Sequence, residues 1–136
     1  MGYNWAVPHL QIIYASTSGH TEFVCSKILE QWKGAEMLRV ELAKPEDLVK
    51  GDILLLASST WNTGGIEGQL NPHMDAFVHG AAKDVKFAGK KVLIVGLGDH
   101  RYRYTCAAAD VLKTFVETHG GVVIDPLLKI INEPYD

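Results

Sequence analysis

The sequence predicts an α/β fold, a doubly wound parallel sheet with helices on its faces, and three observations lead to it. Apolar runs alternate along the chain with stretches whose apolar residues recur at helical spacing. Two runs, 53–57 and 92–95, are continuously apolar, as strands buried on both faces are. The chain has 136 residues, 47% of them hydrophobic, which suits one domain with its own core.

Each element follows from its own pattern. Strands are predicted at 10–14, 37–42, 53–57 and 92–95, with an interrupted last strand at 122–124 and 127–131. Helices are predicted at 20–33, 72–81 and 105–119, and one helical turn at 44–49. The helices carry their core stripes on Val24, Ile28 and Trp32, on Met74, Phe77 and Val78, and on Ala108, Val111, Leu112 and Phe115. Residues 1–8 form a short arm of the single domain 1–136.

Composition narrows the function classes. No apolar run reaches the ~18 residues of a membrane span, and the first residues lack the pattern of a signal peptide. Cys25 and Cys106 fall in helical patterns, so we expect reduced thiols, no disulfide, no metal site and a cytoplasmic protein. The net charge of -3 comes without a basic stripe, which argues against nucleic-acid binding.

Three loops leave the carboxyl ends of buried strands, at 15–21, 58–71 and 96–104. In open parallel sheets, ligands bind beyond these ends, where the strand order reverses. The first loop offers the hydroxyls of Ser16, Thr17, Ser18 and Thr21 at a helix N-terminus, where free amides and the helix dipole favour an anion. It contains no Lys or Arg, and ordinary N-capping explains its hydroxyls equally well.

The other two loops carry aromatic residues. Trp61 stands among small polar residues, and Tyr102 lies in the third loop. Both residues could form walls for a planar ligand. Alternatively, Trp61 is folded back onto the core and Tyr102 is an ordinary surface residue. Together with the anion site, the three loops indicate a planar ring with a phosphorylated tail.

These residues resemble the flavodoxin family. Residues 16–21 are similar to its Thr/Ser-x-Thr/Ser-Gly-x-Thr phosphate loop, 59–61 to the loop whose Trp covers the inner flavin face, and 98–106 to the short-chain loop whose Tyr covers the outer face. The resemblance spans about residues 9–131. It implies a flavodoxin-like five-stranded parallel sheet of order 2-1-3-4-5, noncovalent FMN, and low-potential transfer of single electrons between redox proteins by transient contact; flavodoxin is a known example of FMN binding at the switch point.

The resemblance also implies the cofactor-binding residues. They are Ser16, Thr17, Ser18, Gly19, His20, Thr21, Ser59, Thr60, Trp61, Asn62, Thr63, Gly64, Gly98, Asp99, Tyr102, Tyr104 and Cys106. Thr60, Asp99 and Cys106 would contact the polar edge of the flavin, and His20 would lie near the phosphate.

Two features are expected to tune the potentials: the residue after Trp61 and the charge of the third loop. The peptide after Trp61 turns on reduction in flavodoxins, and many short-chain members have Gly where this chain has Asn62, so we expect a less stabilised semiquinone. His100, Arg101 and Arg103 lie in the third loop, and cations near the flavin would favour its fully reduced anion. The alternative is that both arginines face solvent or pair with acidic residues.

The sequence stops where the family adds a last helix beside the first one, so this helix is expected to be absent and a sheet face open. Three explanations compete: a shortened chain, a homodimer over the open face, or cover by the arm with Tyr3 and Trp5.

Other functions are less consistent with the residues. A small FMN-dependent reductase of this fold class is the alternative, but such enzymes usually lack the Trp and Tyr walls. A non-redox binding module would not need them either. A receiver domain needs an acidic cluster, and strands 1 and 3 end in alanine and serine.

Overall fold

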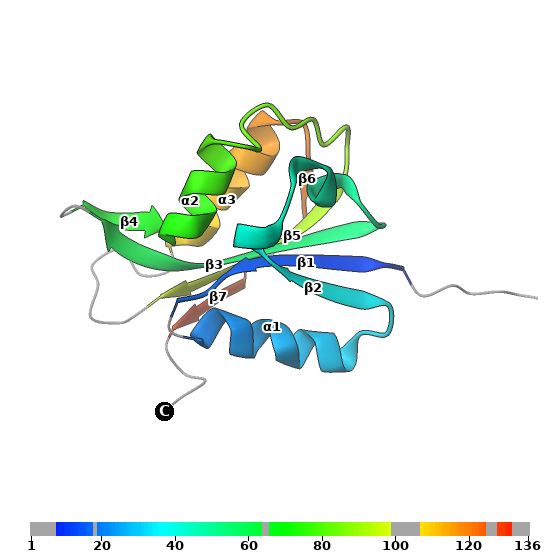
Figure 1. Ribbon diagram of the computed structural model, residues 1–136, viewed down its shortest axis with the longest axis horizontal. Coiled ribbons are helices and arrows are strands. Elements are labelled where there is room, and N and C mark those ends of the chain that lie inside the picture. The colour runs from blue at the N-terminus through cyan, green and yellow to red at the C-terminus, as the bar shows by residue number, and fades with distance from the viewer. Residues whose placement is uncertain (1–7, 18, 64–65, 99–106, 125–127, 132–136) are drawn as a thin grey trace, which may run out of the picture.

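The computed structural model describes residues 8–17, 19–63, 66–98, 107–124 and 128–131. These residues form a sheet of seven strands with helices on both faces (Figure 1). Helix α1 (His20–Gln31) covers one face, and α2 (Pro72–His79) and α3 (Ala107–Thr118) cover the other. None of the helices in the described part of the chain could cross a membrane.

The parallel strands follow the predicted order. They run β2-β1-β3-β5-β6, with β7 also paired to β5. Their bounds are β1 Leu10–Ala15, β2 Ala35–Arg39, β3 Ile53–Thr63, β5 Lys91–Gly98, β6 Val122–Val123 and β7 Leu128–Ile131. Since β6 and β7 are two parts of one interrupted strand beside β5, the expected order 2-1-3-4-5 is confirmed.

The second strand differs from its prediction. It ends at Arg39, and Val40–Leu42 forms a 3-10 turn (η1) instead of continuing the strand to residue 42. Val40 is 2% exposed because the turn directs it into the core beneath α2. The predicted turn at 44–49 is confirmed as the 3-10 helix η2, Pro45–Val49.

The long loop predicted at 58–71 is wrong. Strand β3 continues to Thr63 and returns as β4 (Ile66–Leu70), an antiparallel partner whose register shifts between Trp61 and Thr63. Figure 1 shows this hairpin extending past the helices. Most of its residues are polar because much of the hairpin lies beyond the part of the sheet that is covered on both faces, although Leu70 at the end of β4 is buried in the core. Strand β5 likewise runs to Gly98, three residues into the predicted loop 96–104.

The core lies on both sides of the sheet. Beneath α2 and α3 the predicted stripes are buried, with Val111 only partly so. On the α1 side, Cys25 is fully buried, and Val24, Ile28 and Trp32 pack against the strands while half-buried.

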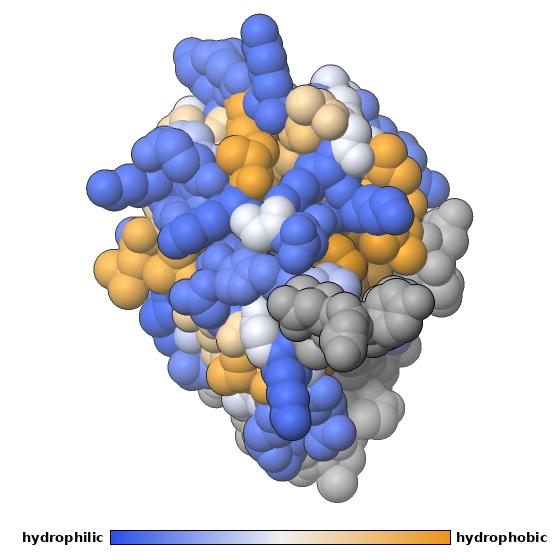
Figure 2. Space-filling model, turned by 90° about the vertical axis from the view of Figure 1, so that its right-hand side faces the viewer, coloured by the Kyte–Doolittle hydropathy of each residue, from blue (hydrophilic) through white to orange (hydrophobic). Residues whose placement is uncertain are grey.

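The amino-end edge of the sheet is polar, and hydrogen bonds between side chains and backbone join its segments. The amide of His9 donates to Asp52 Oδ2 over 2.7 Å, and the Lys90 ammonium donates to the carbonyls of Val49, Lys50 and Gly51. Polar side chains dominate this face in Figure 2. The opposite, carboxyl-end edge carries the loops in which the ligand site is predicted.

Candidate functional site

The loop after β1 is held by its own first serine. Ser16 is 4% exposed, and its Oγ accepts from the amides of Gly19 (3.1 Å) and Glu22 (3.3 Å). Gly19 precedes α1 with φ 96°, a left-handed conformation that disfavours any side chain. The Ser16 hydroxyl therefore caps α1, as the capping interpretation anticipated for this residue type.

Thr21 behaves differently from Ser16. Its side chain is 1% exposed, and its Oγ1 has no hydrogen-bond partner among the described residues. Buried hydroxyls are nearly always hydrogen-bonded. Here the unpartnered hydroxyl lies in the first turn of a 12-residue helix, where amides and the dipole favour an anion. A phosphate oxygen in this loop would accept a hydrogen bond from the Thr21 hydroxyl, so the residues present fit the phosphate of FMN.

Asn71, a residue outside the predicted site, joins the first two loops. It is fully buried, and its Nδ2 donates to Thr17 Oγ1 (3.0 Å) and Ser59 Oγ (3.4 Å). Ser59 Oγ also accepts from Trp61 Nε1 at 2.9 Å. A continuous series of hydrogen bonds therefore runs from Thr17 to the Trp61 ring.

Asn71 has further bonds that fix its own position. Its Oδ1 accepts from the His73 amide at 2.9 Å and so caps α2. Its backbone amide lies 3.1 Å from both Ser58 Oγ and the Ser59 carbonyl oxygen and donates to them. Each polar group of Asn71 thus has a partner, which makes it a rigid junction.

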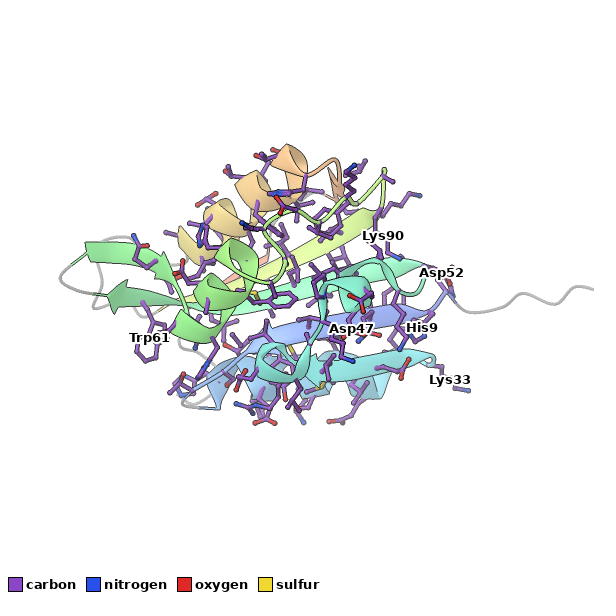
Figure 3. The ribbon with its side chains drawn as sticks, turned by 45° about the horizontal axis from the view of Figure 1, so that its top comes forward. His9, Lys33, Asp47, Asp52, Trp61 and Lys90 are labelled. Carbon is purple, nitrogen blue, oxygen red and sulfur yellow. The ribbon has the colours of Figure 1, made fainter. Side chains whose placement is uncertain are left out.

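Trp61 lies at the carboxyl-end side of the molecule, remote from His9 and Lys90 (Figure 3). Its side chain is half-buried, so one part of the ring remains available to a ligand. Thr60 is 5% exposed, and its Oγ1 accepts from the Ala108 amide at the start of α3 (3.0 Å). The Thr60 hydroxyl therefore links β3 to the start of α3.

Part of the predicted site lies outside the described residues. This holds for Ser18, Gly64, Asp99, Tyr102, Tyr104 and Cys106, and for His100, Arg101 and Arg103. Asn62 and Thr63 lie in β3, and Gly98 ends β5. The structure thus brings the first two loops together, and the second aromatic wall stays a prediction.

Sequence reasoning missed Arg39 and Asn71. Arg39 Nη2 donates to the Ser16 carbonyl at 2.8 Å. A basic residue at the end of strand 2 would have been a usable signal, but the strand was expected to run three residues further. The Asn-Pro pair at 71–72 marks a helix start, yet nothing local indicates its bond to Thr17.

Burial and Glu22 set the ionisation of two neighbouring groups. The Tyr14 hydroxyl donates to Glu22 Oε2 at 3.1 Å, and burial, followed by this bond, raises the pKa of Tyr14. Burial also raises the pKa of Cys25 to about 12, with a smaller contribution from the Glu22 charge. Both groups are neutral at neutral pH, which suits the apolar underside of α1.

Away from these loops, the described residues offer few candidate ligand sites. A cavity of about 410 Å³ lies between the C-terminal parts of α2 and α3, lined by Val78, His79, Lys83, Val111, Thr114, Phe115, Thr118 and His119. Its histidines are already engaged: His79 lies 3.1 Å from Asp75 Oδ1, and His119 lies 2.7 Å from the Phe115 and Lys83 carbonyls. Within the described ranges, no three His, Cys, Asp or Glu residues converge as metal ligands.

The comparisons with known proteins point the same way. The family model described as flavodoxin matches residues 12–135. The chain is 34% identical over 131 residues to the flavodoxin of Maridesulfovibrio salexigens, covering 90% of this chain and 86% of that one. It superposes on oxidised flavodoxin 1 of Bacillus cereus (TM-score 0.79, 25% identity, 94% and 87% covered) and on flavodoxin 2 of the same organism (0.77, 28%, 94% and 87%).

Proposed function

Since this chain belongs to the flavodoxin family, we propose that its FMN lies at the carboxyl-end edge of the sheet, between the loops that follow β1, β3 and β5. As a flavodoxin, it is an FMN-binding electron carrier that serves redox proteins, and not an enzyme. Bound FMN supplies the one-electron chemistry, while the protein binds, orients and shields it.

The phosphate loop, residues 15–21, would hold the phosphate of FMN. The observation that carries this is the buried Thr21 hydroxyl, which lacks a partner among the described residues. Ser16 would keep the loop in shape through its bonds to Gly19 and Glu22. Thr17, Ser18, Gly19 and His20 would complete the cradle with amides and hydroxyls.

The flavin ring would lie between Trp61 and Tyr102. The bond of Trp61 to Ser59 holds the indole edge, so that its face can pack on the ring. The other proposed contacts of the ring are the second-loop residues Thr60, Asn62, Thr63 and Gly64 and the third-loop residues Gly98, Asp99, Tyr104 and Cys106.

Titration of the flavin-free protein with FMN and with riboflavin tests the phosphate site. Wild type should prefer FMN on the order of a hundredfold, because several charge-assisted hydrogen bonds require the phosphate.

Thr21→Val removes the hydroxyl but keeps the shape of the side chain. It should lower FMN affinity about tenfold, leave riboflavin affinity unchanged and not destabilise the flavin-free protein. Thr118→Val on exposed α3 surface is the matched control. A wild type that binds both flavins equally would reject the phosphate site.

We further propose a cytoplasmic protein that meets its donor and acceptor proteins transiently. The Cys25 thiol is free, as is usual in reducing compartments. Two copies would pair over the sheet face beside α1, where Ile53 and Leu93 are only partly buried. Light scattering after size exclusion tests the pairing, and a mass of one chain across concentrations would reject it.

A further inference from the structure

The phosphate loop has no basic residue of its own, yet the fold brings one to it. Arg39 is the last residue of β2, and in the parallel pairing of β1 and β2 its Cα lies opposite that of Tyr14. Tyr14 is two residues ahead of Ser16, so Arg39 stands beside the start of the loop. Its guanidinium lies over the Tyr14 ring, 5.6 Å from the ring centre.

Arg39 holds one peptide of the loop. Its Nη2 donates to the Ser16 carbonyl at 2.8 Å. The carbonyl and the amide of a trans peptide point in opposite directions. With the Ser16 carbonyl fixed toward Arg39, the Thr17 N–H of the same peptide must point away from it. Arg39 therefore decides which way this loop amide faces.

Arg39 also forms an ion pair with a carboxylate at the helix N-terminus, where the anion is expected to bind. Glu22 is in the first turn of α1, where its charge competes with an anion for the helix N-terminus. Glu22 Oε1 lies 3.6 Å from Arg39 Nη1, and Oε2 accepts from the Tyr14 hydroxyl at 3.1 Å. A second carboxylate, Glu41, lies 3.3 Å from Arg39 Nε. The two carboxylates thus offset the positive charge of the guanidinium. Arg39 would therefore favour a bound anion by orienting the loop peptide and screening Glu22 rather than by adding net positive charge.

We propose that Arg39 is a positioning residue for the phosphate of FMN: it orients the Ser16–Thr17 peptide and screens Glu22 from the bound anion. This rests on the proposed phosphate site. A guanidinium suits the task because its planar fork reaches the loop carbonyl and both carboxylates at once, which a lysine ammonium cannot do.

A purely structural role of Arg39 predicts a different effect on flavin binding. If Arg39 only stabilised the fold, its loss would weaken FMN and riboflavin binding alike, because both share the ring. A role toward the phosphate changes the ratio of the two dissociation constants, since riboflavin lacks the phosphate. The ratio therefore separates the two roles without any measurement of electron transfer.

The experiment titrates flavin-free wild type, Arg39→Gln, Glu22→Gln and the double variant with FMN and with riboflavin. Arg39→Gln should lower the preference for FMN about tenfold, because a Thr17 amide that is no longer directed would lose one charge-assisted hydrogen bond to the phosphate. The double variant should recover part of it, because the unscreened carboxylate is gone. Lys27→Gln removes one positive charge from exposed α1 surface and should leave the preference unchanged.

The following outcomes would count against the proposal. An unchanged preference in Arg39→Gln, which includes equal weakening of both flavins, rejects the role toward the phosphate. A double variant no better than Arg39→Gln rejects the screening of Glu22. If Arg39→Gln fails to fold, Arg39→Lys carries the test with an expected loss of about threefold, and an unchanged preference rejects the proposal. A wild type without preference for FMN rejects the phosphate site itself, which distinguishes the two failures.

Discussion

The side-chain amide of Asn71 donates to Thr17 Oγ1 over 3.0 Å and so ties the start of α2 to the phosphate loop, 54 residues earlier in the chain. The same amide lies 3.4 Å from Ser59 Oγ, which holds Trp61. The phosphate loop and the aromatic wall are thus joined through a residue that belongs to neither motif. We therefore expect a shift of one to move the other through this buried, fully bonded side chain.

Substitutions of Asn71 should separate its two tasks. Asn71→Ala loses the cap of α2 and both loop bonds, and should lower the free energy of unfolding by about 3 kcal/mol. Asn71→Ser keeps a capping hydroxyl but is too short to reach Thr17, so it should cost about 1 kcal/mol less than the alanine variant. Denaturant unfolding measures both. If the serine variant binds FMN as tightly as wild type, the bond to Thr17 does not contribute to the site.

Gly96 should resist substitution because α3 packs directly on it. A Cβ at Gly96 would lie 2.7 Å from the Cβ and 2.7 Å from the amide nitrogen of Ala109. Gly96→Ala should therefore move α3, lower the free energy of unfolding by about 1–3 kcal/mol and weaken flavin binding, since the third loop leads into this helix. Ala109→Gly should not restore the protein, because the backbone contact remains.

Gly89 provides the control for Gly96. It has φ +83° with nothing near an added Cβ, so Gly89→Ala costs only the backbone strain of about 1 kcal/mol. Flavin affinity should be unchanged in this variant. Equal losses of affinity in both variants would mean that reduced stability, and not the position of α3, explains the result.

The sheet was predictable because its signals are local. Strands buried on both faces must be apolar throughout, and residues 53–57 and 92–95 are. Helices that pack on one face of a sheet must carry a stripe of apolar residues toward it, as α2 and α3 do. Once strands and helices alternate, the loops after the strands share one edge, which is why the phosphate loop and Trp61 could be placed on the same side of the molecule.

The rest depends on contacts that no local pattern encodes. The β3–β4 hairpin reads as a loop because strands outside the covered sheet need no apolar faces. Arg39 reaches Ser16 across 23 residues and Asn71 reaches Thr17 across 54. Serines and threonines of one motif look alike in sequence, and Ser16 and Thr21 are both buried, but their hydrogen bonds differ: the Ser16 hydroxyl caps the helix, and Thr21 Oγ1 has no partner among the described residues.

The thiol of Cys25 should be unreactive in the folded protein. Cys25 is fully buried with its pKa raised from 9.0 to about 12. In a Cys106→Ser background, a thiol reagent at pH 8 should therefore react only as fast as the protein opens. Above pH 9 the unfolded thiol loses its proton while the folded one keeps it, so this group lowers the free energy of unfolding as the pH rises, by about 1 kcal/mol per unit.

Comparison with Cys25→Ala in the same background isolates this effect from other titrating groups. The difference in unfolding free energy between the two proteins should shrink from pH 9 to pH 10. A difference that stays constant would show that the thiol titrates alike in both states, and a fast reaction at pH 8 would contradict its burial.

The potential of the first electron should depend on the residue after Trp61. Asn62 lies in β3 where the register to β4 shifts, next to the proposed ring wall. If this peptide turns on reduction, as in the family, glycine lowers the cost of the turned form by up to about 1 kcal/mol, or about 40 mV for one electron. Asn62→Gly should raise the potential of the first couple in a spectroelectrochemical titration and leave the second nearly unchanged. Asn62→Ala, which also lacks the side-chain amide but tolerates left-handed backbone poorly, should not raise it. Equal potentials in the glycine and alanine variants would mean that backbone freedom at residue 62 does not set the first potential.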